Sequence, residues 1–116
     1  MAQLLNQSRN NISLATSVEV ANGFYSRLMG LMFKSSLTPN TGLWFHGCSS
    51  IHTCFMRFAI DVVYVDKNLK VKRVYENLKP WRMTRFVSGA DSVFELPAGT
   101  VKEREVRIGD QLYVGN

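Results

Sequence analysis

The residues best suited to chemistry lie in one short segment of the chain, from His46 to Asp61. This segment contains both cysteines, both histidines, an arginine and an aspartate. Cysteine and histidine can act as nucleophile, base or metal ligand, and the planar guanidinium of arginine can bind an anion. The segment leads directly into an apolar run, so we expect a rigid strand to position these side chains.

Non-catalytic binding is the leading functional expectation, with a cleft near residues 46–61 that takes a small polar or anionic ligand or a protein partner. Arg57 is the natural contact for an anion, and His52 can donate or accept a hydrogen bond. Asp61 and Glu95 lie within apolar runs, where an acid needs a partner. For Asp61 we favour a partner within the fold, either backbone amides or an arginine (Arg57 or Arg27), over direct ligand contact. The candidate ligand-binding residues are His52, Arg57, Asp61, Cys48, Ser50 and Glu95.

Two enzyme-like alternatives use the same segment. Residues two apart in extended backbone point to the same side, so the order His-x-Cys-x-x-x-His-x-Cys offers two pairs of zinc ligands. Its three-residue spacer matches no common zinc motif, so we expect no metal and no cofactor. A thiol-dependent enzyme would use Cys48 beside His52, but no known protease or transferase signature surrounds this cysteine. The disfavoured metal set is His46, Cys48, His52 and Cys54.

Positive charge is concentrated in the second half of the chain. The net charge is +5, and seven cations between Lys67 and Arg85 face one acid, Glu76. Aromatic residues alternate with these cations over residues 67–86, a pattern typical of single-stranded nucleic-acid binding. A solvated basic rim over the core explains the same pattern, so a nucleic-acid partner is the second alternative function.

The length and the two ends of the chain set further expectations. A chain of 116 residues with 46% hydrophobic residues can form one core of ordinary size. No run approaches the roughly 18 apolar residues of a membrane helix, and the start lacks a secretory signal. We therefore expect a cytoplasmic protein with no membrane partner, a flexible tail over residues 1–11 and a single domain over residues 12–116.

Strand patterns dominate the elements that must position the site. The run from Phe58 to Val65 is apolar on both faces, which indicates a central strand. We expect it to pair antiparallel with Val71–Tyr75 through a hairpin turn in which Asn68 takes the left-handed conformation. Other strands are expected over residues 14–20, from residue 43, and over residues 92–96 and 111–114.

Two short helices complete the expected elements. An amphipathic pattern covers residues 24–33, and Thr100–Glu103 has the capping-box pattern of a helix start. Strands outnumber helices and do not alternate with them. The sequence therefore predicts an α+β fold: a β-rich single domain with a mostly antiparallel sheet.

Five motifs occur in a fixed order along the chain. They are Arg27–Phe33, Gly42–Phe45, Ser50–Asp66, Phe94–Gly99 and Gly109–Asp110. Together they resemble the landmarks of the domain of unknown function family 192, over nearly the whole chain. The resemblance implies a mostly antiparallel, partly barrel-like sheet with a few short helices, and it brings no established activity. Two positions depart from the family: Cys54 replaces a bulky aromatic, and Asn68-Leu69 replaces an Asp-Gly-like turn.

Overall fold

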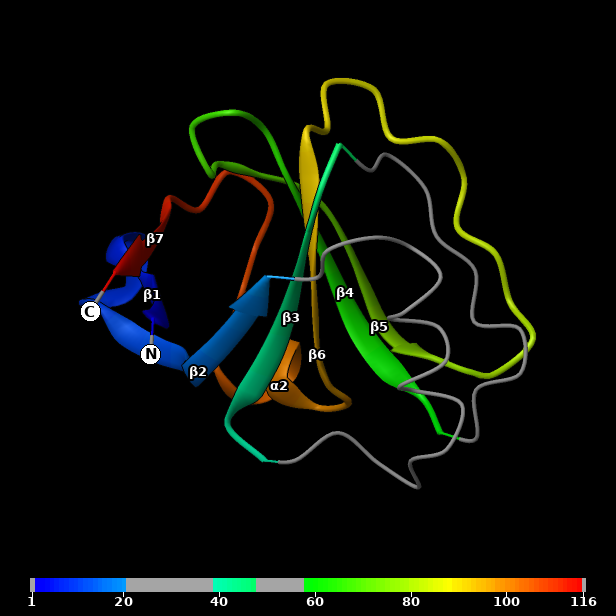
Figure 1. Cartoon of the computed structure of the whole chain (residues 1–116), viewed down its shortest axis with the longest axis horizontal. Helices are drawn as coiled ribbons and strands as arrows, with labels where there is room; N and C mark the ends of the chain where they lie inside the picture. The colour runs from blue at the N-terminus through cyan, green and yellow to red at the C-terminus, as the bar shows by residue number, and fades with distance from the viewer. Residues whose placement is uncertain (1, 21–38, 48–57, 116) are drawn as a thin grey trace.

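The computed structural model describes residues 2–20, 39–47 and 58–115, and these ranges form one curled sheet (Figure 1). A 3-10 helix η1 (Gln7–Arg9) follows the first strand, and a one-turn helix α2 (Thr100–Glu103) precedes the last. The strands are β1 (Ala2–Asn6), β2 (Ile12–Val20), β3 (Thr41–His46), β4 (Ile60–Val65), β5 (Val71–Leu78), β6 (Ser92–Pro97) and β7 (Leu112–Gly115).

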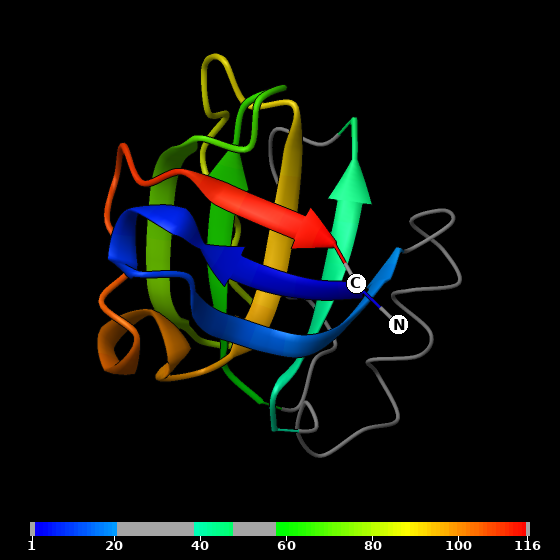
Figure 2. The same cartoon turned by 90° about the vertical axis from the view of Figure 1, so that its left-hand side faces the viewer.

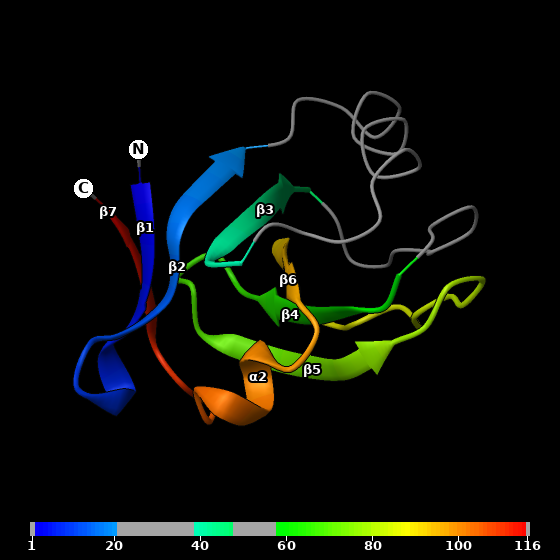
Figure 3. The same cartoon turned by 90° about the horizontal axis from the view of Figure 1, so that it is seen from below.

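The sheet closes partly on itself. Its strand order is β5-β4-β6-β3-β2-β1-β7, and every neighbouring pair is antiparallel except β2 with β3. The two outer strands meet at one end, where the Val71 amide donates to the Asp110 carbonyl and the Leu112 amide donates to the Leu69 carbonyl, both at 2.9 Å. The result is a half-barrel (Figures 2 and 3), which confirms the expected mostly antiparallel, partly barrel-like sheet.

Strand β4 is the central strand that the sequence predicts. All six of its residues are buried, and it pairs antiparallel with β5 on one side and β6 on the other. Side chains alternate along each strand, so β4 and β6 contribute to two separate clusters. Val63 and Phe94 belong to the cluster inside the half-barrel, whereas Val62 and Val93 belong to a second cluster on the opposite face.

The N-terminal residues differ from the flexible tail expected from the sequence. Residues 2–6 form β1, which lies between β2 and β7. The side chains of Leu4 and Asn6 are fully buried. The segment is too short and too polar to show a strand period, and its partner β7 comes from the other end of the chain. Its pairing is therefore a tertiary effect that local sequence does not reveal.

Helical structure is scarce in the part of the chain that the structure describes. It consists of η1 and α2, so the β-rich character is established and the α+β label applies only loosely. The helix expected over residues 24–33 lies outside the described residues. No helix within the described ranges is long and apolar enough to cross a membrane.

The hairpin between β4 and β5 forms as expected but uses a different residue for its left-handed position. Leu69, not Asn68, has a positive φ of 62°. Asp66 stabilises the turn, because its Oδ1 accepts hydrogen bonds from the Asn68 and Lys70 amides, each at 2.9 Å. Leu69 also packs against the inner cluster, and this contact explains why a leucine occupies a position that suits glycine.

We predict that this turn makes a small, pH-dependent contribution to stability. The amide hydrogen bond from Lys70 is the main cause that lowers the pKa of Asp66, and the amide of Asn68 acts in the same direction. The contribution is present above the unfolded-state pKa and is lost as pH falls through the lower folded-state pKa. The melting-temperature difference between wild type and Asp66→Ala should therefore shrink between about pH 5 and pH 3. A constant difference over this range would contradict the assignment.

Candidate functional site

Most of the residues singled out in the sequence lie outside the described residues. This is true of four candidate ligand-binding residues and of one further member of the metal set: Cys48, Ser50, His52, Arg57 and Cys54. The cleft near residues 46–61 therefore remains a prediction. The structure does place Asp61, Glu95 and His46.

Asp61 is a fully buried acid that holds three backbone amides. Its Oδ1 accepts a hydrogen bond from the Asn77 amide at 2.8 Å. Its Oδ2 accepts from Gly99 at 3.1 Å and from Val101 at 2.8 Å. This carboxylate therefore ties an irregular position of β5 and the start of α2 to the central strand, as the interpretation through backbone amides requires.

Helix α2 forms where expected, but its cap differs from the expected capping box. Gly99 is the N-cap residue, with φ of 97°, and no side chain caps the helix from this position. Thr100 instead donates its hydroxyl to the Pro97 carbonyl at 2.7 Å. The acceptor for the helix amides is the Asp61 carboxylate, which comes from a strand 40 positions away from Val101. The capping-box prediction was wrong because this long-range acid takes the place of the local side chains.

Glu95 is buried like Asp61 but points to the opposite face of the sheet. In the pairing of β4 with β6, Asp61 lies opposite Leu96, whereas Glu95 lies opposite Val62. Directly opposed residues share a face, so Asp61 faces the inner side and Glu95 faces the outer cluster with Val62. The two acids therefore cannot act together as an acid–base pair in one cleft.

His46 lies exposed at the end of β3, next to an aromatic group. Its ring centroid is 4.2 Å from that of Trp44, which in turn stacks on Phe94 at 5.1 Å. Trp44 Nε1 also donates to Ser92 Oγ at 2.9 Å. Within residues 2–20, 39–47 and 58–115, no three His, Cys, Asp or Glu side chains gather around a possible metal position.

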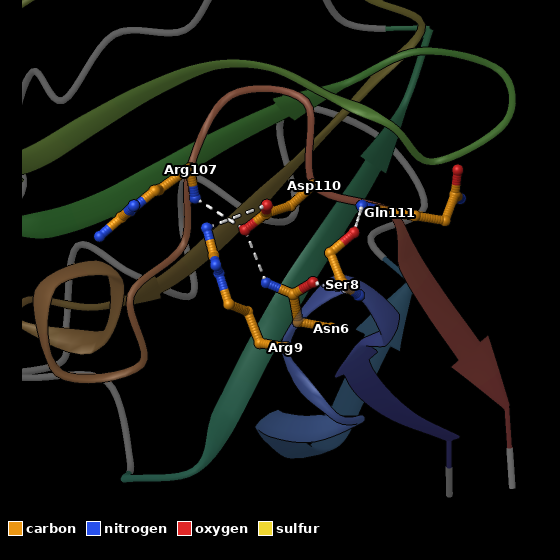
Figure 4. A network of polar contacts seen from close by, with 6 residues as sticks. All are labelled: Asn6, Ser8, Arg9, Arg107, Asp110 and Gln111. Carbon is orange, nitrogen blue, oxygen red and sulfur yellow. Dashed lines mark hydrogen bonds and ion pairs between the residues drawn. The ribbon is translucent and has the colours of Figure 1, made fainter.

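A polar network around a buried carboxylate joins η1 to the turn before β7, and it was not foreseen from the sequence (Figure 4). Its centre is Asp110, whose Oδ2 accepts hydrogen bonds from Asn6 Nδ2 and from the Arg107 amide, each at 2.9 Å. The guanidinium of Arg9 lies 3.5 Å from Oδ1 of the same carboxylate. The available signal was the Gly109–Asp110 landmark, but the side-chain partners Asn6 and Arg9 lie 104 and 101 positions earlier in the chain.

The same network continues through the first helical turn. Asn6 Oδ1 accepts from the Ser8 amide at 3.1 Å, and Ser8 Oγ accepts from the Gln111 amide at 2.9 Å. These contacts join β1 and η1 to the turn before β7. Because protein groups already occupy these acceptors, we assign the network to closure of the half-barrel and not to ligand binding.

The segment after β5, residues 79–87, exposes large apolar side chains. Trp81 is 59% exposed, Met83 75% and Phe86 74%. Thr84 and Val87 point inward: Thr84 shares a 2.6 Å hydrogen bond with the Tyr64 hydroxyl, and Val87 packs in the outer cluster. We call this stretch the 79–87 segment.

Position and charge distinguish the 79–87 segment further. It lies at one end of the long axis of the molecule, opposite the two chain termini (Figures 1 and 3). Its three cations Lys79, Arg82 and Arg85 are all exposed, and it contains no acid. Sequence analysis found the basic and aromatic composition here but not the outward direction of these side chains.

Comparison with known proteins gives one family over almost the whole chain. The model of the domain of unknown function family 192, described as uncharacterized ACR, matches residues 5–114. A UPF0127 protein of Pyrococcus horikoshii is 34% identical over 115 residues, which cover 94% of this chain and 96% of that protein. A UPF0127 protein of Pyrococcus abyssi is 30% identical, with 97% of each chain covered.

Two crystal structures share the fold. One, from Sinorhizobium meliloti 1021, is described as a candidate transcription regulator; it has a TM-score of 0.76 and 24% identity, and the match covers 97% of this chain and 91% of that one. The other, a protein of unknown function from Novosphingobium aromaticivorans, has a TM-score of 0.77 and 18% identity, with 97% and 82% covered. At these identities the likeness concerns the fold.

Proposed function

We propose that this chain, which belongs to the domain of unknown function family 192, is a non-catalytic binding protein that takes an anionic partner on the 79–87 segment. The observation that carries the proposal is the outward exposure of Trp81, Met83 and Phe86 among three exposed cations. Large apolar side chains gathered on a surface are typical of interaction sites. Exposed cations add attraction for negative charge on the partner.

The placement of the two buried acids supports binding over acid–base catalysis. Asp61 is engaged by three backbone amides, and Glu95 points to the other face of the sheet. A pair of carboxylates working on one substrate would have to share a cleft. A metal- or thiol-dependent enzyme built on Cys48 and His52 remains the alternative from the sequence.

Two residues next to the undescribed part of the 46–61 stretch pack on the same face of the sheet as the 79–87 segment. Phe45, just before that stretch, and Phe58, within it, pack in the outer cluster together with Val87. Val87 at the end of the 79–87 segment and these two phenylalanines therefore share one face of the sheet. The cleft expected from the sequence near residues 46–61 stays a prediction and is separate from the proposed contact surface.

Single-stranded nucleic acid is a second candidate partner. Trp81 and Phe86 are exposed and lie close in sequence to exposed cations, a combination that suits base stacking. Tyr75, the third aromatic of this stretch, is engaged elsewhere: its ring lies edge-on to Tyr64, and the Arg73 guanidinium is 5.2 Å from its centroid. The candidate transcription regulator that shares the fold is too distant in sequence to support nucleic-acid binding by itself.

Amide chemical shifts of the labelled full chain would test the proposal. Three anionic probes are titrated separately: oligothymidylate, an acidic amphipathic peptide and vesicles containing phosphatidylglycerol. We expect at least one probe to shift or broaden the amides of residues 79–87 while those of the turn at residues 107–110 stay unchanged. No effect from any probe, or effects centred on residues 46–61, would contradict the 79–87 segment as the contact surface.

A further inference from the structure

We infer that the 79–87 segment docks on the surface of a membrane that contains anionic lipids, with Trp81, Met83 and Phe86 inserted at the level of the headgroups. This inference rests on the proposed function, because it names the partner of the same surface. It concerns contact with one leaflet by an irregular segment and involves no membrane-spanning element.

The segment is built with its small residues inward and its large apolar residues outward. Thr84 is 3% exposed and Val87 8%, and both hold the segment against the sheet. The three largest apolar side chains are instead each more than half exposed. Trp81 also adopts a left-handed backbone with φ of 63°, which is rare for a bulky residue. Such conformations concentrate at sites of function, where the surrounding structure imposes them.

The exposed side chains match the chemistry of a membrane interface. Tryptophan is enriched at the headgroup level because its ring is apolar and its N–H is polar. Methionine and phenylalanine can enter the boundary between headgroups and acyl chains. Lys79, Arg82 and Arg85 flank them, and basic residues near a bilayer are attracted by the negative potential of anionic lipids. A pinned segment of this kind also loses little conformational freedom on insertion.

The exposed apolar surface is large enough for contact with a bilayer. Three side chains of this kind, each exposed by 59% to 75%, present roughly 400 Å² of apolar surface. A protein–protein interface of standard size buries about 800 Å² on each partner, a little over half of it apolar, so area alone does not separate a protein from a membrane. A bilayer needs no complementary partner surface, so a small projecting group of apolar side chains is sufficient when cations assist it.

The side-chain types also favour a membrane over nucleic acid. Base stacking uses the flat faces of aromatic rings, and the flexible thioether of Met83, the most exposed of the three at 75%, provides no such face. The sequence-based expectation of no membrane partner rested on the lack of a long apolar segment and of a secretory signal. Neither feature concerns a short loop that contacts the surface.

Vesicle co-sedimentation of the full chain tests this inference. The probes are vesicles of phosphatidylcholine alone and vesicles in which about a quarter of the lipid is phosphatidylglycerol. We expect binding to the anionic vesicles with a blue shift of tryptophan emission, and strong weakening at high salt. The combined variant Met83→Ser and Phe86→Ser should bind roughly tenfold more weakly, and Arg85→Gln about fivefold. The matched control is Ile108→Ser, because Ile108 is 66% exposed in the turn before β7, away from the segment.

The outcomes separate membrane docking from the broader proposal that the 79–87 segment binds an anionic partner. Membrane docking is supported if the paired Ser substitutions and Arg85→Gln weaken vesicle binding while Ile108→Ser does not. All variants should also melt like wild type. Equal vesicle binding by all variants, or no vesicle binding, overturns membrane docking. The proposed function then stands if oligothymidylate or the acidic peptide still affects residues 79–87. Lack of any effect from all three probes overturns both.

Discussion

A chain that begins at Ile12 and lacks residues 1–11 is expected not to fold. The deletion removes β1, which lies inside the sheet between β2 and β7 and provides the only strand partner of β7 among the described strands. It also removes the fully buried Leu4 and the Asn6 amide that donates to Asp110. Loss of one buried leucine alone costs about 2–5 kcal/mol, a large share of the 5–15 kcal/mol that stabilises a typical domain.

Circular dichroism and thermal melts of the full and shortened chains measure this effect. We expect a cooperative transition for the full chain and none for the shortened one. Two single substitutions localise the cause: Leu4→Ala should lower the free energy of unfolding by about 2–5 kcal/mol, and the exposed Gln3→Ala by less than about 0.5 kcal/mol. If the shortened chain melts like the full one, the sequence-based expectation of a flexible tail is correct and this prediction is wrong.

The elements predicted correctly are those whose signal is local. The six buried residues of β4 form an almost unbroken apolar run, and its hairpin with β5 needs only a short turn at Asp66–Leu69. Strand β6 is bounded by the turn at Ala98–Gly99 in the same way. Side-chain periodicity and turn residues act over fewer than about ten positions, so they can be read from one sequence.

The features that were missed depend on contacts between distant parts of the chain. Strand β1 is defined by its pairing with β7, and Asn6 finds its acceptor, Asp110, 104 positions away. The cap of α2 comes from Asp61 and not from the local Thr100–Glu103 pattern. Spacing within a sequence does not encode such long-range partners, even where it identifies the residues that need them.

The sequence predicted the composition of the candidate surface but not the direction of its side chains. The basic and aromatic composition of residues 67–86 was evident, but an irregular segment has no period that tells inward from outward side chains. The structure supplies this direction through two inward anchors, Thr84 and Val87. For the acids, the sequence identified Asp61 and Glu95 as residues that need partners, and the strand register shows that they serve opposite faces.

Replacement of Asp61 by alanine is expected to be the most damaging single substitution among the charged residues that the structure describes. Three backbone amides would lose their acceptor, and the one from Val101 is buried. A hydrogen bond to a charged group contributes about 1.5–3 kcal/mol, and an unsatisfied buried amide costs about 1–3 kcal/mol. Partial access of water to the Asn77 and Gly99 amides limits the sum, so we expect a loss of about 3–5 kcal/mol in the free energy of unfolding.

Chemical denaturation of Asp61→Ala, Asp61→Asn and Glu103→Ala separates this role from a role in binding. Asparagine keeps one oxygen acceptor, so Asp61→Asn should lie between wild type and alanine, whereas the Glu103 side chain is 73% exposed and its removal should change stability little. If Asp61 acts through the fold, hydrogen exchange should accelerate most at the Asn77, Gly99 and Val101 amides. Vesicle binding by the folded fraction should then equal that of wild type, because Asp61 faces the inside of the half-barrel and the 79–87 segment is anchored on the other face. A variant of normal stability with lost binding would instead place Asp61 in the contact site.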